Sequence, residues 1–180
     1  DDHPTGIALR ASGETPPAEQ FALPEDRTAV ADWFSTYLGE SVTVRREPAG
    51  GMPDDTTDAG PTVISTATVE TVAEWFELPP ENVRRRFRAN LEVGGVDPFW
   101  EDRLYAADDP VSFRVGDVEL VGAGPCNRCV VPPRDPRTGE EDDGFRERFV
   151  RRRAETLPTW VADERFDHFF KLMVNTRVPE

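Results

Sequence analysis

Both cysteines of the chain lie in one stretch, Gly124-Pro125-Cys126-Asn127-Arg128-Cys129-Val130-Val131-Pro132-Pro133-Arg134-Asp135-Pro136-Arg137-Thr138-Gly139. They form a Cys-x-x-Cys pair, and an arginine directly precedes the second cysteine. A neighbouring guanidinium favours the thiolate, which is the form of cysteine that binds metals and attacks electrophiles. Cys129 is therefore the better candidate for chemistry, with Arg128 expected to stabilise its charge.

Three interpretations of the pair compete. A thioredoxin-like dithiol would need a helix that opens at the motif, whereas Val130-Val131 followed by two prolines predicts a short strand entering a turn. A structural zinc site needs four ligands, and His3 and His168 lie far from the motif in no finger-like spacing. The third interpretation is a pair of half-buried thiols without chemistry, because cysteine is often fully buried. The residues alone disfavour the dithiol, support zinc weakly and leave the third interpretation open.

The composition limits the partners. The chain has 180 residues and a net charge of −14, and Lys171 is its only lysine among 21 basic residues. This charge repels the phosphate backbone of nucleic acids, so a nucleic-acid partner is not expected. An acidic, arginine-rich surface also indicates a halophilic origin, since excess carboxylates keep proteins soluble in a high-salt cytoplasm.

The length and hydropathy pattern indicate one domain over residues 1–180. No segment approaches the roughly eighteen apolar residues that a membrane span requires, and no secretory apolar region is present. We therefore expect no membrane partner and a cytoplasmic location.

Short strands separated by Gly and Pro turns, with a few helices between them, predict a mainly β fold with interspersed helices, arranged as a barrel. Gly39 is placed to end the first helix, and Gly116-Asp117 to turn a hairpin. Helices are expected at 27–38, 69–76 and 146–153, and strands at 7–10, 41–46, 62–65, 86–93, 111–115, 118–121 and 167–175.

Arg84-Arg85-Arg86-Phe87-Arg88 is a strongly cationic run on an acidic chain. In a strand, Arg86, Arg88 and Asn90 would point to one face because side chains alternate. Two guanidiniums and an amide on one face could hold a phosphate. The alternative is a set of surface ion pairs with the abundant carboxylates.

Three motifs resemble the MOSC domain, which is named for the C-terminal part of molybdenum cofactor sulfurase. Arg128-Cys129 and the following Asp135-Pro136-Arg137-Thr138-Gly139 resemble its R-C-x(5)-D-P-x-T-G signature. Residues 86–90 resemble its R-F-R-P-N element, with Ala89 in place of the proline, and residues 116–120 resemble the strand that leads to the cysteine. The resemblance covers about residues 33–175 and implies a MOSC-type β-barrel. It also implies a fragment that lacks the family's N-terminal β region and last strand.

The resemblance implies binding of the molybdenum cofactor, molybdopterin, a pterin dithiolene that carries a phosphate. Similarity to the amidoxime-reducing component family implies an oxidoreductase that reduces N-hydroxylated compounds. Cys129 would then be the catalytic residue and the thiolate ligand of the metal. The implied cofactor contacts are Arg86, Arg88, Asn90, Asn127 and Arg128, with Asp58 and Ser65 as second-rank candidates.

The same resemblance allows a different function. Cys129 could hold a persulfide or pass the cofactor on, as in MOSC domains attached to pyridoxal-phosphate sulfurases. The reductase would take a small-molecule substrate and electrons from a ferredoxin-like protein, whereas the carrier would work with a sulfurase. Both functions are open from the sequence.

Overall fold

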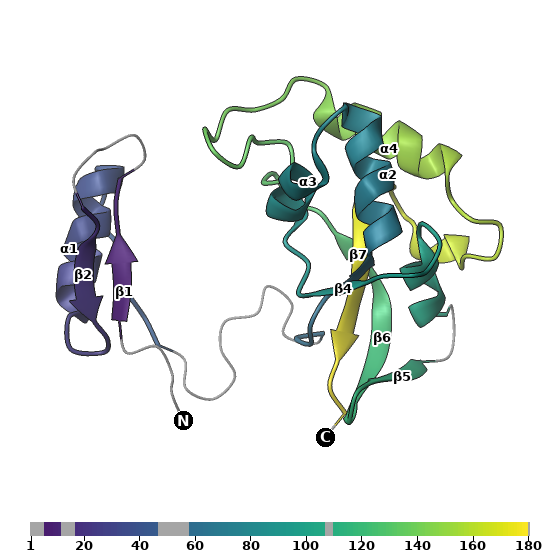
Figure 1. Ribbon diagram of the computed structural model, residues 1–180, viewed down its shortest axis with the longest axis horizontal. Coiled ribbons are helices and arrows are strands. Elements are labelled where there is room, and N and C mark those ends of the chain that lie inside the picture. The colour runs from purple at the N-terminus through teal and green to yellow at the C-terminus, as the bar shows by residue number, and fades with distance from the viewer. Residues whose placement is uncertain (1–5, 12–16, 47–57, 107–109, 180) are drawn as a thin grey trace. The chain divides into compact units, whose positions relative to one another are not determined.

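The computed structural model describes residues 6–11, 17–46, 58–106 and 110–179 (Figure 1). The chain divides into two compact units, Asp1–Met52 and Pro53–Glu180. Each unit is described by itself. The assignment of residues 1–180 to a single domain stays a prediction.

The first unit contains a small sheet and a helix. β1 (Gly6–Leu9) pairs with β2 (Glu19–Ala22) in antiparallel orientation, and α1 (Arg27–Leu38) follows. The predicted helix is confirmed, with Gly39 at φ 72° as its C-cap. The predicted strand at 41–46 is wrong: these residues have no regular structure and pair with no described strand. Alternation makes a strand only where a partner edge is available.

The second unit is built on a five-stranded sheet with the strand order β4-β3-β7-β6-β5. β3 and β4 are parallel, and the other neighbours are antiparallel. The sheet curls into half of a barrel, which confirms the predicted mainly β class with interspersed helices. β7 comes last in the sequence yet lies in the middle of the sheet. The strands are β3 (Val63–Ser65), β4 (Leu91–Val93), β5 (Val111–Val115), β6 (Val118–Asn127) and β7 (Lys171–Arg177).

Three helices of this unit pack over one face of the sheet (Figure 1). α2 (Thr66–Phe76) and α3 (Pro80–Phe87) connect the parallel strands β3 and β4, because parallel neighbours need a long crossover. α4 (Phe145–Glu155) and the short 3₁₀ helices η1 (Trp100–Leu104) and η2 (Asp163–Arg165) complete the unit. None of the helices in the described part of the chain has the length and apolar character needed to cross a bilayer.

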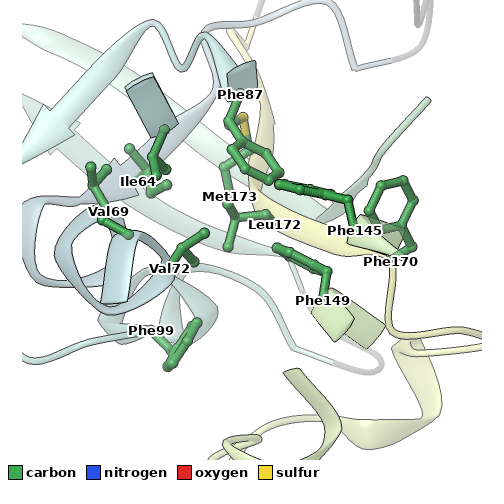
Figure 2. Close-up of a cluster of buried hydrophobic side chains, with 12 residues drawn as sticks. Ile64, Val69, Val72, Phe87, Phe99, Phe145, Phe149, Phe170, Leu172 and Met173 are labelled. Carbon is green, nitrogen blue, oxygen red and sulfur yellow. The ribbon is translucent and has the colours of Figure 1, made fainter. Parts of the chain in front are cut away.

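Aromatic side chains dominate the core between the helices and the sheet (Figure 2). The Phe149 ring of α4 lies 5.6 Å from the Phe87 ring of α3 and 5.3 Å from the Phe170 ring. Phe149 is fully buried. These contacts fix the last turn of α3, which matters for the site because the Phe87 carbonyl is part of it.

The other face of the sheet packs against η1. Val63 faces this side and Ile64 the helix side, as alternation in a strand requires. Gly122 of β6 allows the close approach, since a Cβ at this position would lie 1.6 Å from the Leu104 carbonyl oxygen. Any larger residue at position 122 would push η1 off the sheet.

A buried ion pair connects η1 to α4. The Arg153 guanidinium donates to the Asp102 carboxylate, and their side chains are only 1% and 2% exposed. Arg153 also lies 4.3 Å from the centre of the Phe99 ring, and the Tyr105 hydroxyl donates to Asp102 at 3.3 Å. Arg153 is thus the charged side chain of α4 that turns inward beside the buried Phe145 and Phe149.

The buried carboxyl of Glu101 is expected to make the stability of the fold depend on pH. Its side chain is buried, and neither carboxylate oxygen accepts a hydrogen bond within the described residues. Burial raises the pKa of this carboxyl above its ordinary value of 4.5. The folded state then keeps a proton that the unfolded chain has lost, so stability falls as the pH rises from 4.5 through the folded pKa.

Glu101→Gln stays neutral and is expected to remove this decline. The free energy of unfolding in urea, measured for the variant minus the wild type, should grow as the pH rises above 4.5. Glu70→Gln, on the exposed face of α2, is the control and should leave the pH profile unchanged. A Glu101→Gln profile parallel to the wild type would contradict the assignment.

Candidate functional site

A cleft of 710 Å³ brings together residues that are far apart in the sequence. Arg88, Asn90, Arg128 and Cys129 all line it, although about forty residues separate the two pairs. Asp58 and Asn127 line it as well. The volume lies within the range of pockets that bind cofactors, about 300–1,000 Å³. Six of the eight sequence-predicted positions therefore share one cavity, and Arg86 and Ser65 do not line it.

Two irregularities in the pairing of β6 and β7 shape the cleft. The first shift adds a residue to β6 beside Gly124, whose φ is 148°, and the second adds one to β7 at Met173, whose φ is 64°. A Cβ at Gly124 would also lie 2.6 Å from the Arg165 guanidinium. Such bulges break the alternation of side chains. As a result, the consecutive residues Cys126 and Asn127 both reach the cleft.

The two cysteines differ in exposure. Cys129 is exposed at the cleft, whereas Cys126, at the end of β6, is only partly exposed and packs against the aromatic core. Both are thiols rather than a disulfide. Among the described residues no group of three or more His, Cys, Asp and Glu is placed to hold a metal ion, so the zinc interpretation gains no support.

The Arg128 guanidinium contacts Cys126, whereas the sequence led us to expect a contact with Cys129. Its Nη1 donates to Cys126 Sγ at 3.1 Å, and no described contact joins it to the Cys129 sulfur. In nearly extended backbone, side chains two positions apart share a face and adjacent ones do not. Among the described residues no contact between Arg128 and the Cys129 sulfur supports the expected stabilisation of a thiolate, which stays a prediction.

Arg128 is held rigidly. Its Nη2 donates to the Phe87 carbonyl at 3.1 Å, and its Nη1 also approaches Met173 Sδ at 3.6 Å. The guanidinium lies 5.7 Å from the centre of the Phe87 ring. Its Nε is buried without a hydrogen-bond partner in the described part of the chain. One fixed cation thus connects the end of α3 with the sulfur of Cys126.

The strand predicted for residues 86–93 is present only as β4, from Leu91. Residues up to Phe87 form the last turn of α3, and Arg88 takes the left-handed C-cap conformation at φ 53°. Pro80 opens this helix, with Glu81 in its first turn and arginines in its last turn, which suits the helix dipole. The expected common strand face of Arg86, Arg88 and Asn90 therefore does not exist.

Arg88 and Asn90 nevertheless reach the cleft from the turn between α3 and β4. Arg88 is exposed, and its guanidinium has no hydrogen-bond or ion-pair partner among the residues that the structure describes. Asn90 Oδ1 accepts bonds from the backbone nitrogen and the hydroxyl of Thr62, both at 2.9 Å. Arg88 is thus available for an anion, whereas half of the Asn90 amide supports the fold.

Arg86 faces the protein interior. Its guanidinium donates to the carbonyls of Pro132 and Arg134 at 2.8 and 2.9 Å and pairs with Asp142 at 2.5 Å. Its Nε donates to Asn82 at 2.6 Å, and its side chain is 1% exposed. Arg86 therefore holds the segment that follows the cysteines onto α3, instead of presenting its charge to the cleft.

Replacing Arg86 with alanine is expected to cost about 2–3 kcal/mol of unfolding free energy, since two buried carbonyls and a carboxylate lose their donor. Urea unfolding measures the loss. Arg151→Ala, on the exposed face of α4, should change the stability by no more than about 0.5 kcal/mol. Equal costs for the two variants would contradict the anchoring role.

The Asp-Pro-x-Thr-Gly run folds into a self-contained turn. Asp135 Oδ1 accepts bonds from the backbone nitrogens of Arg137 and Thr138 at 2.8 and 3.0 Å, and these bonds hold the pKa of Asp135 below its usual value. Gly139 closes the turn at φ 77°. This part of the signature supports the shape of the loop that follows Cys129.

The two second-rank candidates differ. Ser65 is fully buried and caps α2 by accepting from the Thr68 nitrogen at 3.0 Å, so its hydroxyl serves the fold. Asp58 lines the cleft and also a second hollow of 370 Å³.

The second hollow contains two cations that the motifs do not reveal. Arg165 donates to the Ala123 carbonyl, and Lys171 Nζ lies 2.5 Å from Asp167 and donates to the Arg165 carbonyl at 2.9 Å. The hydrogen bond from Lys171 lowers the pKa of Asp167. Asn127 and Asn175 line both hollows, so the two are neighbours. The only signal in the sequence is that Lys171 is the single lysine.

Comparisons with known proteins identify a family and two similar proteins. The family model described as MOSC domain matches residues 56–172, more than half of the chain. Molybdenum cofactor sulfurase of Caenorhabditis briggsae is 30% identical over 80 residues, which cover 44% of this chain and 10% of that protein. The protein of the same name from Caenorhabditis elegans is 29% identical over 80 residues, with the same coverage. The chain thus matches about a tenth of the length of these curated relatives.

Proposed function

Because the chain belongs to the MOSC domain family, we propose that its 710 Å³ cleft binds the molybdenum cofactor. The observation that carries the proposal is the convergence in one cavity of cofactor size of an exposed thiol, Cys129, with the Arg88 guanidinium, which has no partner among the residues that the structure describes. The cofactor offers a counterpart to each group: a metal that accepts a soft sulfur ligand and a phosphate that accepts charge-assisted bonds.

Four residues of the cleft have distinct tasks in this proposal. Cys129 supplies a thiolate as a single protein ligand, which suits a metal that arrives with dithiolene sulfurs of its own. Arg88 binds the phosphate, and the amides of Asn90 and Asn127 orient the pterin through hydrogen bonds. When bound, the cofactor would supply two-electron chemistry, such as the reduction of an N-hydroxylated small molecule, while the protein supplies position and charge.

A second function is favoured by the relatives, which are named molybdenum cofactor sulfurases. In this alternative, Cys129 carries sulfur as a persulfide. Its exposure suits the role, because a donor protein must reach the thiol. The partner would then be a sulfurase, whereas the reductase would take electrons from a ferredoxin-like protein.

Reconstitution tests the cofactor-binding proposal. The chain is incubated anaerobically with isolated molybdenum cofactor, passed through gel filtration and analysed for molybdenum and pterin. We expect the two to elute with the protein in equal amounts. Elution of both at the position of the free cofactor would contradict binding in the cleft.

Arg88→Ala is expected to weaken cofactor retention by roughly tenfold or more, because a charge-assisted bond to phosphate contributes about 1.5–3 kcal/mol. Arg85→Ala is the matched control, since Arg85 lies on the same helix and pairs with Glu81 in solvent at 3.1 Å. It removes the same charge and should leave retention unchanged. Equal weakening by both variants would indicate a general charge effect instead of a phosphate site.

A further inference from the structure

The second hollow, which adjoins the proposed cofactor cleft, is lined by side chains of both charges. The charged residues that line it are Asp58, Glu164, Arg165, Asp167 and Lys171. The nonpolar part of its lining, among the described residues, is Ala123, Gly124 and Pro125. Pockets that bind small molecules are usually lined mainly by apolar side chains. This hollow, of 370 Å³, instead suits a small ligand that is charged and polar.

The Arg165 guanidinium is held in place with two of its nitrogens still available. Its Nη2 donates to the Ala123 carbonyl, whereas its Nε and Nη1 donate to no residue in the described part of the chain. Gly124 permits this position, since a Cβ there would lie 2.6 Å from Nη2. The bulge at Gly124 thus lets a cation lie across β6 with donors left for a ligand.

The Glu164 carboxylate supplies the opposite charge. It is exposed, and no described residue donates to it or pairs with it. Glu164 and Arg165 are neighbours in η2 yet form no ion pair, because successive side chains of a 3₁₀ helix point about 120° apart. Lys171 and Asp167, by contrast, neutralise each other at 2.5 Å. The hollow therefore offers a guanidinium and a carboxylate that do not compensate each other.

We propose that the second hollow binds a small zwitterion and is the substrate subsite of the reductase; this rests on the cofactor-binding function proposed above. The substrate class is then an N-hydroxylated derivative of an amino acid. Its carboxylate binds Arg165, its ammonium group binds Glu164, and its N-hydroxylated end extends into the cleft. Asn127 and Asn175 line both hollows, and their amides make no side-chain hydrogen bond within the described residues, so they are available to this end. A zwitterion has no net charge and thus meets no overall repulsion from a chain of charge −14.

Ligand binding to the full chain without cofactor tests the proposal. L-Glutamine is the probe, because it joins a zwitterionic end to an uncharged polar end. L-Glutaminamide lacks the carboxylate, and N-acetyl-L-glutamine lacks the ammonium charge. Backbone amide chemical shifts, recorded by NMR during each titration, give the affinity and locate the site. L-Glutamine should shift signals of residues 123–127 and 164–175. It should bind at least about tenfold more tightly than either analogue, because each analogue loses a charge-assisted contact.

Two variants assign the charges of the ligand to their partners. Arg165→Met should weaken L-glutamine binding at least about tenfold and leave L-glutaminamide binding unchanged. Glu164→Gln should likewise remove the preference for L-glutamine over N-acetyl-L-glutamine. Arg177→Met is the matched control, since Arg177 is exposed on β7 and does not line the hollow. Urea unfolding checks that each variant folds.

The outcomes separate the inference from the function on which it rests. Equal affinity of the wild type for the three ligands, or shifts confined to other residues, overturns the zwitterion subsite and leaves the cofactor proposal standing; this result needs no variant. Equal weakening by Arg165→Met and Arg177→Met shows a general charge effect and overturns it as well. If the chain binds L-glutamine as expected but retains no cofactor in the reconstitution, the reductase proposal falls and the zwitterion site stands.

Discussion

Replacing Cys129 with serine is expected to abolish persulfide loading and to reduce molybdenum retention to background, while the chain keeps its fold. The hydroxyl of serine is not ionised at neutral pH and is a hard ligand, so it replaces neither the nucleophile nor the soft donor. Cys129 is exposed, so the unfolding free energy should change by no more than about 0.5 kcal/mol. Metal analysis after reconstitution, persulfide mass spectrometry and urea unfolding measure these three quantities.

Cys126→Ser is the matched comparison for this variant. It removes the same atom three residues earlier, and it should keep both loading and metal retention. Equal losses from the two replacements would contradict the assignment of the carrying thiol to Cys129. That result would instead favour a dithiol or a pair of zinc ligands.

Replacing Arg153 with methionine should cost about 3–5 kcal/mol of unfolding free energy. The variant leaves the Asp102 carboxylate buried, at 2% side-chain exposure, without its cation. Burial already raises the pKa of Asp102 above the usual value, and Arg153 opposes this shift. Since small domains are stable by about 5–15 kcal/mol in total, urea unfolding should show a large decrease in the midpoint.

Arg152→Met is the control, because the neighbouring side chain is half exposed and only pairs with Glu155 at 3.6 Å. It should change the stability by less than about 1 kcal/mol. Adding Asp102→Asn to Arg153→Met should recover part of the loss, because the buried charge disappears. A similar cost for Arg152→Met and Arg153→Met, or no recovery in the double variant, would refute the uncompensated-charge explanation.

Helix ends and turns that are determined by residues adjacent in the sequence could be predicted from the sequence alone. The helix that ends at Gly39 and the hairpin around Gly116-Asp117 are both present, because glycine at positive φ encodes each of them locally. The strand predicted for residues 86–90 failed because alternate charges imitated a strand pattern. Pro80 and the distribution of charge along α3 were the stronger helix signals.

The cleft was predicted better than the direction of its side chains. The motifs identified residues that converge, but sequence adjacency could not show that Arg128 contacts Cys126. Likewise, nothing local distinguishes exposed Arg88 from Arg86, which is buried by a loop about fifty residues later. The strand order also depends on pairings between distant segments, which no local pattern encodes.

The central place of β7 determines when during synthesis the cleft can form. A ribosome produces β3, β4, β5 and β6 before residues 171–177, yet β3 and β6 meet only through this strand. α2, α3 and the hairpin of β5 and β6 involve nearby residues and can form while the chain is still growing. Until β7 leaves the exit tunnel, the sheet cannot join the Thr62 side of the cleft to the Cys126 side, and only contacts such as the hydrogen bond from Arg128 to the Phe87 carbonyl connect them. The complete cleft is therefore expected only after translation of this segment, and a nascent chain stalled before it would present the cysteines on an incomplete sheet.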